Sequence, residues 1–208
     1  DDRLSRGLGD VYKRQAPVCN GYQHNDSFPG SHPLAVGPLG YNGSKAAMEL
    51  ISKADVVLAL GTRLNPFSTL PGYGIDYWPK NATIIQVDMN PDRIGLTKKV
   101  TVGICGDAKQ VAQQILDKLS PDAGNSGRDE RKNLIHKTKS AWLQTLAGLD
   151  HEEDDPGTVW NKEARERDKD RMSPRQAWRA IQDALPKDAI ISSDIGNNCA
   201  IGNAYPTF

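Results

Sequence analysis

The stretch Asp55-Val-Val-Leu-Ala-Leu-Gly61 is a short, unbroken apolar run that ends in glycine. Such a run is typical of a buried parallel strand, because a sheet covered by helices on both faces needs no polar side. A second run, Thr83-Ile-Ile-Gln-Val-Asp88, is rich in β-branched residues and ends in a carboxylate. Val100–Gly106 is a third candidate. We expect all three runs to be strands.

Helical patterns lie between and after these strands. Asn42–Ala54 carries apolar residues at helical spacing, and Asn42 or Ser44 is a suitable N-cap. Asn90-Pro91-Asp92 is a signal for a short helix, with proline in the first turn. Asp107 precedes a third helical pattern, with apolar residues every four positions. Strands that alternate with helices predict an α/β fold with a parallel sheet and helices on its faces.

Composition changes along the chain indicate four segments. Residues 1–15 have no periodicity and are expected to be either a non-native sequencing artefact or a disordered linker. Residues 16–120 are expected to form the parallel-sheet domain. Residues 121–172 are expected to form a charged connector, with a helix over Arg128–Leu149 whose buried side holds Leu134, Ile135, Ala141, Trp142 and Leu146.

A second domain is expected to begin at residues 173–208. Ser173-Pro-Arg-Gln176 matches a capping box, which predicts a helix start. Ala189–Ser193 is predicted to be a strand, followed by the polar loop Asp194–Asn198. Four apolar residues predict the buried face of the helix: Ala177, Trp178, Ile181 and Leu185.

The composition excludes several classes of partner. The 208 residues include 26 basic and 26 acidic ones, so the formal net charge is +0 and neither nucleic acid nor an anionic membrane is expected as a partner. No apolar run is long enough to span a bilayer. The three cysteines, Cys19, Cys105 and Cys199, match no zinc or disulfide spacing, and no metal ligands are predicted. This pattern favours a reducing, cytoplasmic compartment.

Ligands of an open parallel sheet bind beyond the carboxyl ends of its strands. At these positions lie Gly61, where backbone can approach a ligand, and Arg63, which can bind a phosphate. Asp88 is suited to a ribose hydroxyl, and Asp107 either accepts from an adenine amino group or caps its helix. These four residues are a candidate nucleotide site. Surface ion pairing is the alternative for Arg63 and Asp88.

The loop after the last expected strand is a second candidate site. Asp194 and Gly196 lie in it, followed by the neighbouring amides of Asn197 and Asn198. Side-chain amides beside a glycine suit the oxygens of a diphosphate, whereas a polar turn without a ligand is the alternative.

The order of these features resembles a known superfamily. Gly37–Gly43, Gly61-Thr-Arg63, Ile85–Pro91 and Gly106-Asp107-Ala108 resemble the central domain of the thiamin-diphosphate-dependent acetolactate synthases, pyruvate oxidases and oxalyl-CoA decarboxylases. Ile191–Asn198 resembles the opening of their diphosphate-binding domain. The resemblance covers Ala16 to Phe208.

Three stretches resemble one branch of this superfamily, the enzymes that act on sulfoacetaldehyde. These stretches are Asn20–Gly30, Asn65–Gly74 and Ser192–Phe208. The resemblance implies thiamin diphosphate and Mg²⁺ as cofactors, with sulfoacetaldehyde and phosphate as substrates and acetyl phosphate and sulfite as products. It also implies a homo-oligomer, a dimer or tetramer. We expect the activating glutamate, the metal ligands and the first strand–helix unit of the central domain to lie outside this segment, which would then be inactive alone.

Relatives differ in the nucleotide that their central domain holds. The residues Leu64-Asn65-Pro66-Phe67 after Arg63 depart from the acidic pattern of acetolactate synthases, so FAD is not expected and the nucleotide site is expected to be vestigial. Two alternatives stay open. One is a lyase that resembles acetolactate synthase or oxalyl-CoA decarboxylase, and the other is a non-catalytic nucleotide-binding module.

Overall fold

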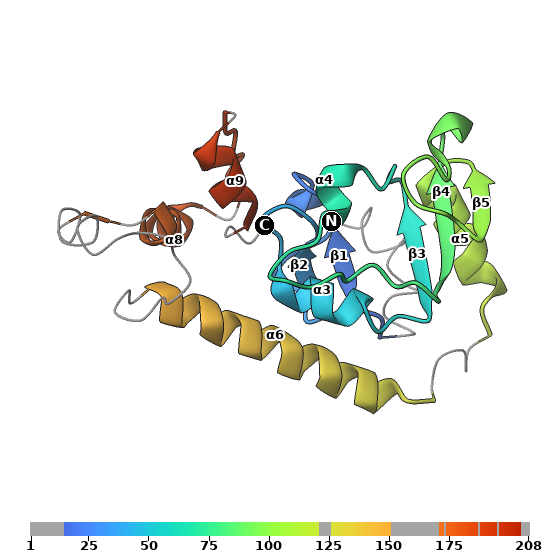
Figure 1. Ribbon diagram of the computed structural model, residues 1–208, viewed down its shortest axis with the longest axis horizontal. Coiled ribbons are helices and arrows are strands. Elements are labelled where there is room, and N and C mark those ends of the chain that lie inside the picture. The colour runs from blue at the N-terminus through green and yellow to red at the C-terminus, as the bar shows by residue number, and fades with distance from the viewer. Residues whose placement is uncertain are drawn as a thin grey trace.

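The computed structural model describes residues 15–120, 126–150, 171–172, 174–186, 188–194 and 196–204 (Figure 1). The expectation for residues 1–15 therefore falls, except for Gln15, outside the described residues, as does the charged stretch 151–170. The elements, in chain order, are β1 (Val18–Asn20), η1 (Asn25–Ser27), β2 (Ala35–Pro38), α3 (Lys45–Ile51), β3 (Val56–Leu60), α4 (Pro66–Thr69), β4 (Thr83–Asp88), η2 (Pro91–Arg93), β5 (Val102–Cys105), α5 (Ala108–Lys118), α6 (Arg128–Asp150), α8 (Pro174–Ala184) and α9 (Asn197–Ala204).

The strands form two parallel sheets. The order β3-β4-β5 makes the larger sheet, with Val57 opposite Ile84 and Val87 opposite Ile104. The strands β1 and β2 pair separately, with a register shift after Val18. The α/β class and the three predicted strands are therefore confirmed, while the expected parallel sheet is divided into two among the described residues.

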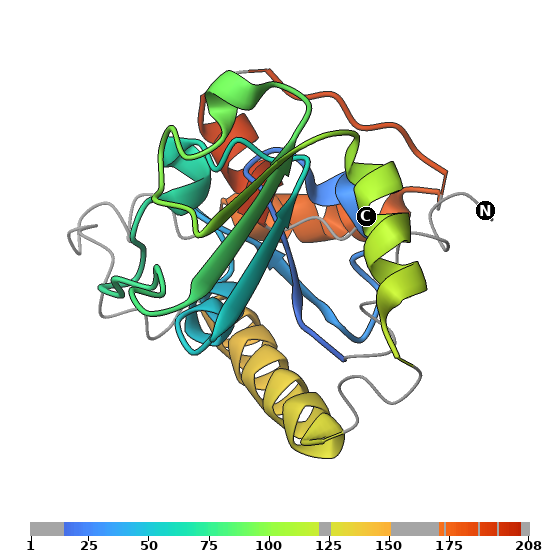
Figure 2. The same ribbon diagram turned by 90° about the vertical axis from the view of Figure 1, so that its right-hand side faces the viewer.

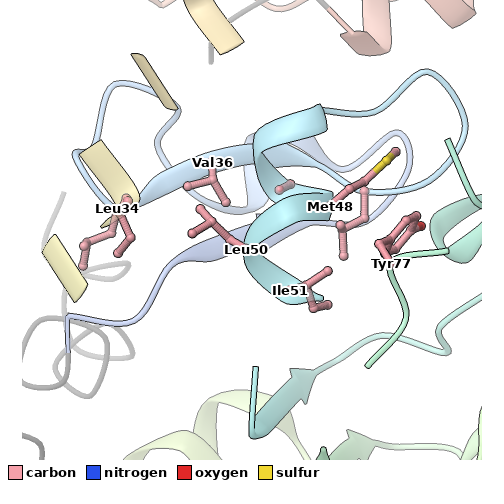
Figure 3. Close-up of a cluster of buried hydrophobic side chains, with 9 residues drawn as sticks. Leu34, Val36, Met48, Leu50, Ile51 and Tyr77 are labelled. Carbon is pink, nitrogen blue, oxygen red and sulfur yellow. The ribbon is translucent and has the colours of Figure 1, made fainter. Parts of the chain in front are cut away.

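One apolar core connects the two sheets. Figure 3 shows Leu50 of α3 facing Leu34 and Val36 from the β2 region, with Met48 and Ile51 of α3 lying toward Tyr77. A smaller cluster lies on the larger sheet, and Val57 and Trp78 pack against both clusters, which joins the sheets into one body. The N-cap of α3 is Ser44, whose side chain accepts a hydrogen bond from the Ala47 backbone N–H.

The long helix α6 runs beside α3 along one side of the molecule (Figures 1 and 2). Ile135 is its one buried apolar residue in the described part, at 2% exposure, and belongs to the main core. Lys139 donates a hydrogen bond from Nζ to the backbone oxygen of His32, 3.2 Å away. The helix was predicted correctly, but its expected buried face was too wide, since Leu134 and Ala141 are exposed.

Acidification is expected to weaken this packing through His32. Burial, and to a smaller degree the charge of Lys139, lowers the pKa of His32 below 6.5. The Nδ1 atom also accepts a hydrogen bond from the Leu34 N–H at 3.1 Å, which requires an unprotonated nitrogen. The unfolded chain therefore binds more protons than the folded chain as the pH falls through 6.5, and the free energy of unfolding should decrease until the pH is below the folded-state pKa.

Urea unfolding of the wild type and of His32→Asn across this pH range measures the effect. Asparagine keeps an acceptor for the Leu34 N–H and does not titrate in this range, so the pH dependence of the variant should be flatter. Equal slopes for the two proteins would show that His32 is not the group responsible.

Two expectations for the C-terminal segment are wrong. Residues 189–193 were predicted to be a strand, but no described strand pairs with them, and Ile190 is 98% exposed. A strand requires a neighbour to complete its backbone ladder, and an apolar pattern alone cannot supply one. The helix α8 forms as predicted, yet none of its residues is buried, and Ile181 is 46% exposed. None of the helices in the described part of the chain has the length and apolar character needed to span a bilayer.

Candidate functional site

The carboxyl ends of β3, β4 and β5 lie together at one edge of the larger sheet, because the three strands are parallel neighbours. The Gly61 N–H donates to the Val87 oxygen at 2.9 Å, and the Gly106 N–H donates to the Asp88 oxygen at 3.1 Å. Gly61 has a positive φ of 63°, and a Cβ there would lie 3.4 Å from the Ala108 Cβ. Backbone and small side chains therefore bring Gly61, Asp88 and the start of α5 to one edge of the sheet.

Both carboxylates at this edge have local partners. Asp88 is 7% exposed, and its Oδ1 accepts a hydrogen bond from the Asn90 N–H at 2.8 Å. Asp107 accepts from the Gln110 N–H at 2.9 Å and is the N-cap of α5. Of the two roles considered for Asp107, the structure shows the cap.

The Arg63 side chain makes no hydrogen bond or ion pair with Asp88 or Asp107 at this edge of the sheet. The side chain is exposed, and no hydrogen bond or ion pair joins it to any described residue. The next residue, Leu64, has a positive φ of 51° and is buried in the smaller core cluster. The chain thus turns inward immediately after the arginine, and the guanidinium has no packing that fixes it toward Asp88.

The second candidate site lies at the start of a helix, where a polar loop was predicted. Gly196 has a φ of 115°, and its oxygen accepts the first helical hydrogen bond, from the Ala200 N–H. Asn197 and Asn198 are exposed in the first turn of α9, and Asp194 is exposed just before it. The first N–H groups of a helix lack partners within the helix, so exposed amides here add to a region that favours anions.

The opposite side of α9 packs against the loop after β1. Asn203 is 4% exposed, and its Oδ1 accepts a hydrogen bond from the Gln23 N–H at 2.8 Å. Its Nδ2 lies 3.5 Å from the Tyr41 oxygen, and its backbone oxygen accepts from Asn25 Nδ2 at 2.7 Å. We call these interactions of Asn203 with Gln23, Asn25 and Tyr41 the Asn203 contact.

A cysteine one helical turn earlier adds to this packing. Cys199 is buried, with its Sγ 2.6 Å from Gln23 Nε2 and 3.8 Å from Tyr22 Oη. Burial, and then the interaction with Cys199, raises the pKa of Tyr22. The Tyr22 ring also stacks on Phe67 at 5.7 Å. The hydrogen bonds of Asn203 and Cys199 could not be predicted from the sequence, because they join residues 162 to 180 positions apart and no local pattern marks them.

The two candidate sites are separate. In Figure 1, α9 lies on the β2 side of the molecule, whereas β4, β5 and α5 lie beyond β3. No group of three or more His, Cys, Asp or Glu side chains in the described part of the chain is placed to hold a metal ion.

The chain is similar in sequence to known proteins of one enzyme family. Residues 11–115 match the family model described as thiamine pyrophosphate enzyme, central domain. The chain is 80% identical over 196 residues to a probable sulfoacetaldehyde acetyltransferase of Rhizobium meliloti, covering 94% of this chain and 33% of that protein. It is 77% identical over 193 residues to a sulfoacetaldehyde acetyltransferase of Roseovarius nubinhibens, covering 93% of this chain and 32% of that protein.

A more distant relative is a probable acetolactate synthase large subunit of Methanocaldococcus jannaschii, 34% identical over 133 residues, which covers 64% of this chain and 20% of that protein. The chain spans about a third of the length of the two sulfoacetaldehyde acetyltransferases that it matches.

Proposed function

Because the chain belongs to the thiamine pyrophosphate enzymes, whose central domain its residues 11–115 match, we propose that it is part of a sulfoacetaldehyde acetyltransferase. The full-length enzyme would convert sulfoacetaldehyde and phosphate to acetyl phosphate and sulfite. The observation that carries this proposal is the identity of 77–80% with two proteins of that name. An acetolactate synthase activity has weaker support, since the identity to such a relative is 34%.

The first turn of α9 fits the diphosphate of the cofactor. Apart from the chain neighbours of Gly196, no heavy atom of the described residues lies within 4 Å of the position where a Cβ would lie. Asn197 and Asn198 are exposed there, and the helix N-terminus supplies a partial positive charge. We infer that residues Asp194, Gly196, Asn197 and Asn198 belong to the diphosphate site.

The chain's own residues would bind and orient the cofactor. Asn197 and Asn198 would donate side-chain N–H groups to diphosphate oxygens, and Gly196 would let the backbone approach closely. Thiamin diphosphate, when bound, supplies the stabilised carbanion that acyl transfer requires. A divalent cation such as Mg²⁺ would neutralise the diphosphate, with oxygen ligands that we expect outside this segment. We also expect a homo-oligomer of the full-length enzyme.

A nucleotide-binding module has less support as a second candidate. Asp88 accepts from the Asn90 N–H, and Asp107 caps α5, so both carboxylates have a role in the local structure that requires no ligand. We infer that the edge formed by Gly61, Asp88 and Asp107, with Arg63 beside it, is a vestigial nucleotide site. Flavin absorbance that stays with the purified full-length enzyme would contradict this inference.

Substrate comparison tests the proposed reaction. The full-length enzyme, loaded with thiamin diphosphate and Mg²⁺, should form acetyl phosphate and release sulfite in equal amounts from sulfoacetaldehyde and phosphate. Pyruvate and oxalyl-CoA, offered separately, should give far lower turnover. Preferential turnover of either would replace the proposal with a lyase of the acetolactate synthase or oxalyl-CoA decarboxylase type.

A further inference from the structure

The first turn of α9 depends on distant residues for its position. Asn197 and Asn198 are exposed, whereas Cys199, Ala200 and Asn203 are buried at 4–9% exposure. Residues three and four apart share one face of a helix, so these buried residues form the face that packs on the rest of the protein. The exposed amides are held in place through that face.

Asn203 is the residue that fixes this packing most specifically. Both ends of its side-chain amide have backbone partners, the Gln23 N–H at 2.8 Å and the Tyr41 oxygen at 3.5 Å. Its own backbone oxygen accepts from Asn25 Nδ2 at 2.7 Å. Apolar packing permits a helix to slide or rotate, but a buried amide with paired donor and acceptor permits one arrangement.

Gln23, one partner in the Asn203 contact, has a constrained backbone. Gln23 has a φ of 64°, a left-handed conformation that costs a non-glycine residue free energy. This backbone orientation directs its N–H to Asn203 Oδ1, and its side chain reaches Cys199. A neighbouring part of α9 packs on α8, where a Cβ at Gly202 would lie 2.8 Å from the Trp178 ring. The helix therefore contacts both the loop after β1 and α8.

We propose that Asn203 is a positioning residue for the diphosphate-binding turn, tying α9 to the central domain through the Asn203 contact. The inference rests on the proposed function, because it takes the first turn of α9 to be the diphosphate site. Asn203 lies six residues after Asn197, about 9 Å along the helix, and acts without touching the cofactor. By binding the loop that contains Gln23 and Asn25, Asn203 fixes where the side-chain amides of Asn197 and Asn198 lie.

Three variants of the full-length enzyme test this role. Asn203→Ala removes the acceptor for the Gln23 N–H and should raise the dissociation constant for thiamin diphosphate by at least about tenfold, as loss of an outer-shell partner does. Activity at saturating cofactor should return to within about threefold of the wild type, because the binding amides themselves are intact. Asn203→Asp keeps the acceptor but turns a carboxylate oxygen toward the Tyr41 oxygen in place of the N–H donor, so it should weaken cofactor binding at least as much as Asn203→Ala.

The third variant, Asn25→Ala, approaches the contact from the other side, since it removes the donor to the Asn203 backbone oxygen. It should weaken cofactor binding in the same direction, and it keeps the test informative if Asn203→Ala does not fold. A merely structural role would lower the melting temperature and the maximal rate in all three variants without an effect that saturating cofactor reverses, and that result would overturn the inference.

The outcomes separate this inference from the proposed function. An active wild type whose cofactor affinity is unchanged by Asn203→Ala and Asn25→Ala would refute the positioning role and leave the function standing. A wild type whose affinity for thiamin diphosphate falls in the Asn203→Ala and Asn25→Ala variants, but which does not turn over sulfoacetaldehyde, would support the positioning role and refute the reaction. A wild type that binds no thiamin diphosphate would overturn both.

Discussion

Gly40→Ala is expected to destabilise the chain by at least about 4 kcal/mol, a loss reached only by exceptional single substitutions. Gly40 has a φ of 84°, and an added Cβ would overlap the carbonyl oxygen of Phe67 and lie 2.7 Å from the carbonyl carbons of Phe67 and Ser68. These are backbone atoms, which cannot rotate away as a side chain would. The Tyr41 N–H also donates to the same Phe67 oxygen at 2.8 Å, so the two segments would have to separate.

Gly74→Ala is the matched control for this substitution. Gly74 has a similar φ of 70°, but beyond its chain neighbours no heavy atom of the described part of the chain lies within 4 Å of its added Cβ. It should therefore lose only about 1 kcal/mol, from the left-handed backbone alone. Urea unfolding followed by circular dichroism measures both variants. Equal losses would mean that the close approach of Gly40 to Phe67 is absent in solution.

Local signals predicted the centre of the fold well. Thr83–Asp88 is a strand with the predicted bounds, and β3 differs from its predicted run by one residue at each end. Asp107 caps α5, one of the two roles that the sequence indicated, because a side-chain acceptor before a helix acts within one turn. Information of this kind is contained in a few neighbouring residues, so it can be recovered without the tertiary structure.

Strand pairing and the burial of helix faces were harder to predict from the sequence. The strands β1 and β2, three and four residues long, show too little alternation to be located individually. Ala189–Ser193 has the composition of a strand, but a strand also needs a partner, which none of the described residues provides. The amphipathic pattern of α8 indicates which side is suited to burial, not whether anything covers it. The helix is therefore right, but its expected face is only half-buried, since Trp178 packs on α9 whereas Ile181 is exposed.

In the candidate site, too, local features could be predicted from the sequence and tertiary contacts could not. The amides at Asn197 and Asn198 could be singled out from their types and their neighbour Gly196, whereas the helix that they begin could not. Asparagine and glycine disfavour helices, and α9 contains both. Its tertiary contacts through Asn203 and Cys199 override that preference. Such contacts leave no pattern in the sequence, so the supporting residues become visible only in the structure.

The double variant Asn197→Ala/Asn198→Ala of the full-length enzyme is expected to weaken thiamin diphosphate binding by at least about 100-fold. Both side chains are exposed at the N-terminus of α9, beside the open space at Gly196. A hydrogen bond to a charged group contributes about 1.5–3 kcal/mol, so the loss of two corresponds to at least two orders of magnitude in affinity. Calorimetric titration with the cofactor in the presence of Mg²⁺ measures the change.

A surface asparagine far from the proposed diphosphate site serves as the control for a non-specific effect of asparagine-to-alanine substitution on cofactor affinity. Asn133 is exposed on α6, and Asn133→Ala should leave cofactor affinity unchanged. The double variant should also keep the wild-type melting temperature without cofactor, because neither Asn197 nor Asn198 is buried. At a cofactor concentration between the wild-type and the variant dissociation constants, only the wild type and Asn133→Ala should gain stability, since the stabilisation grows with the ratio of ligand concentration to dissociation constant. An unchanged affinity of the double variant would move the diphosphate site away from the start of α9.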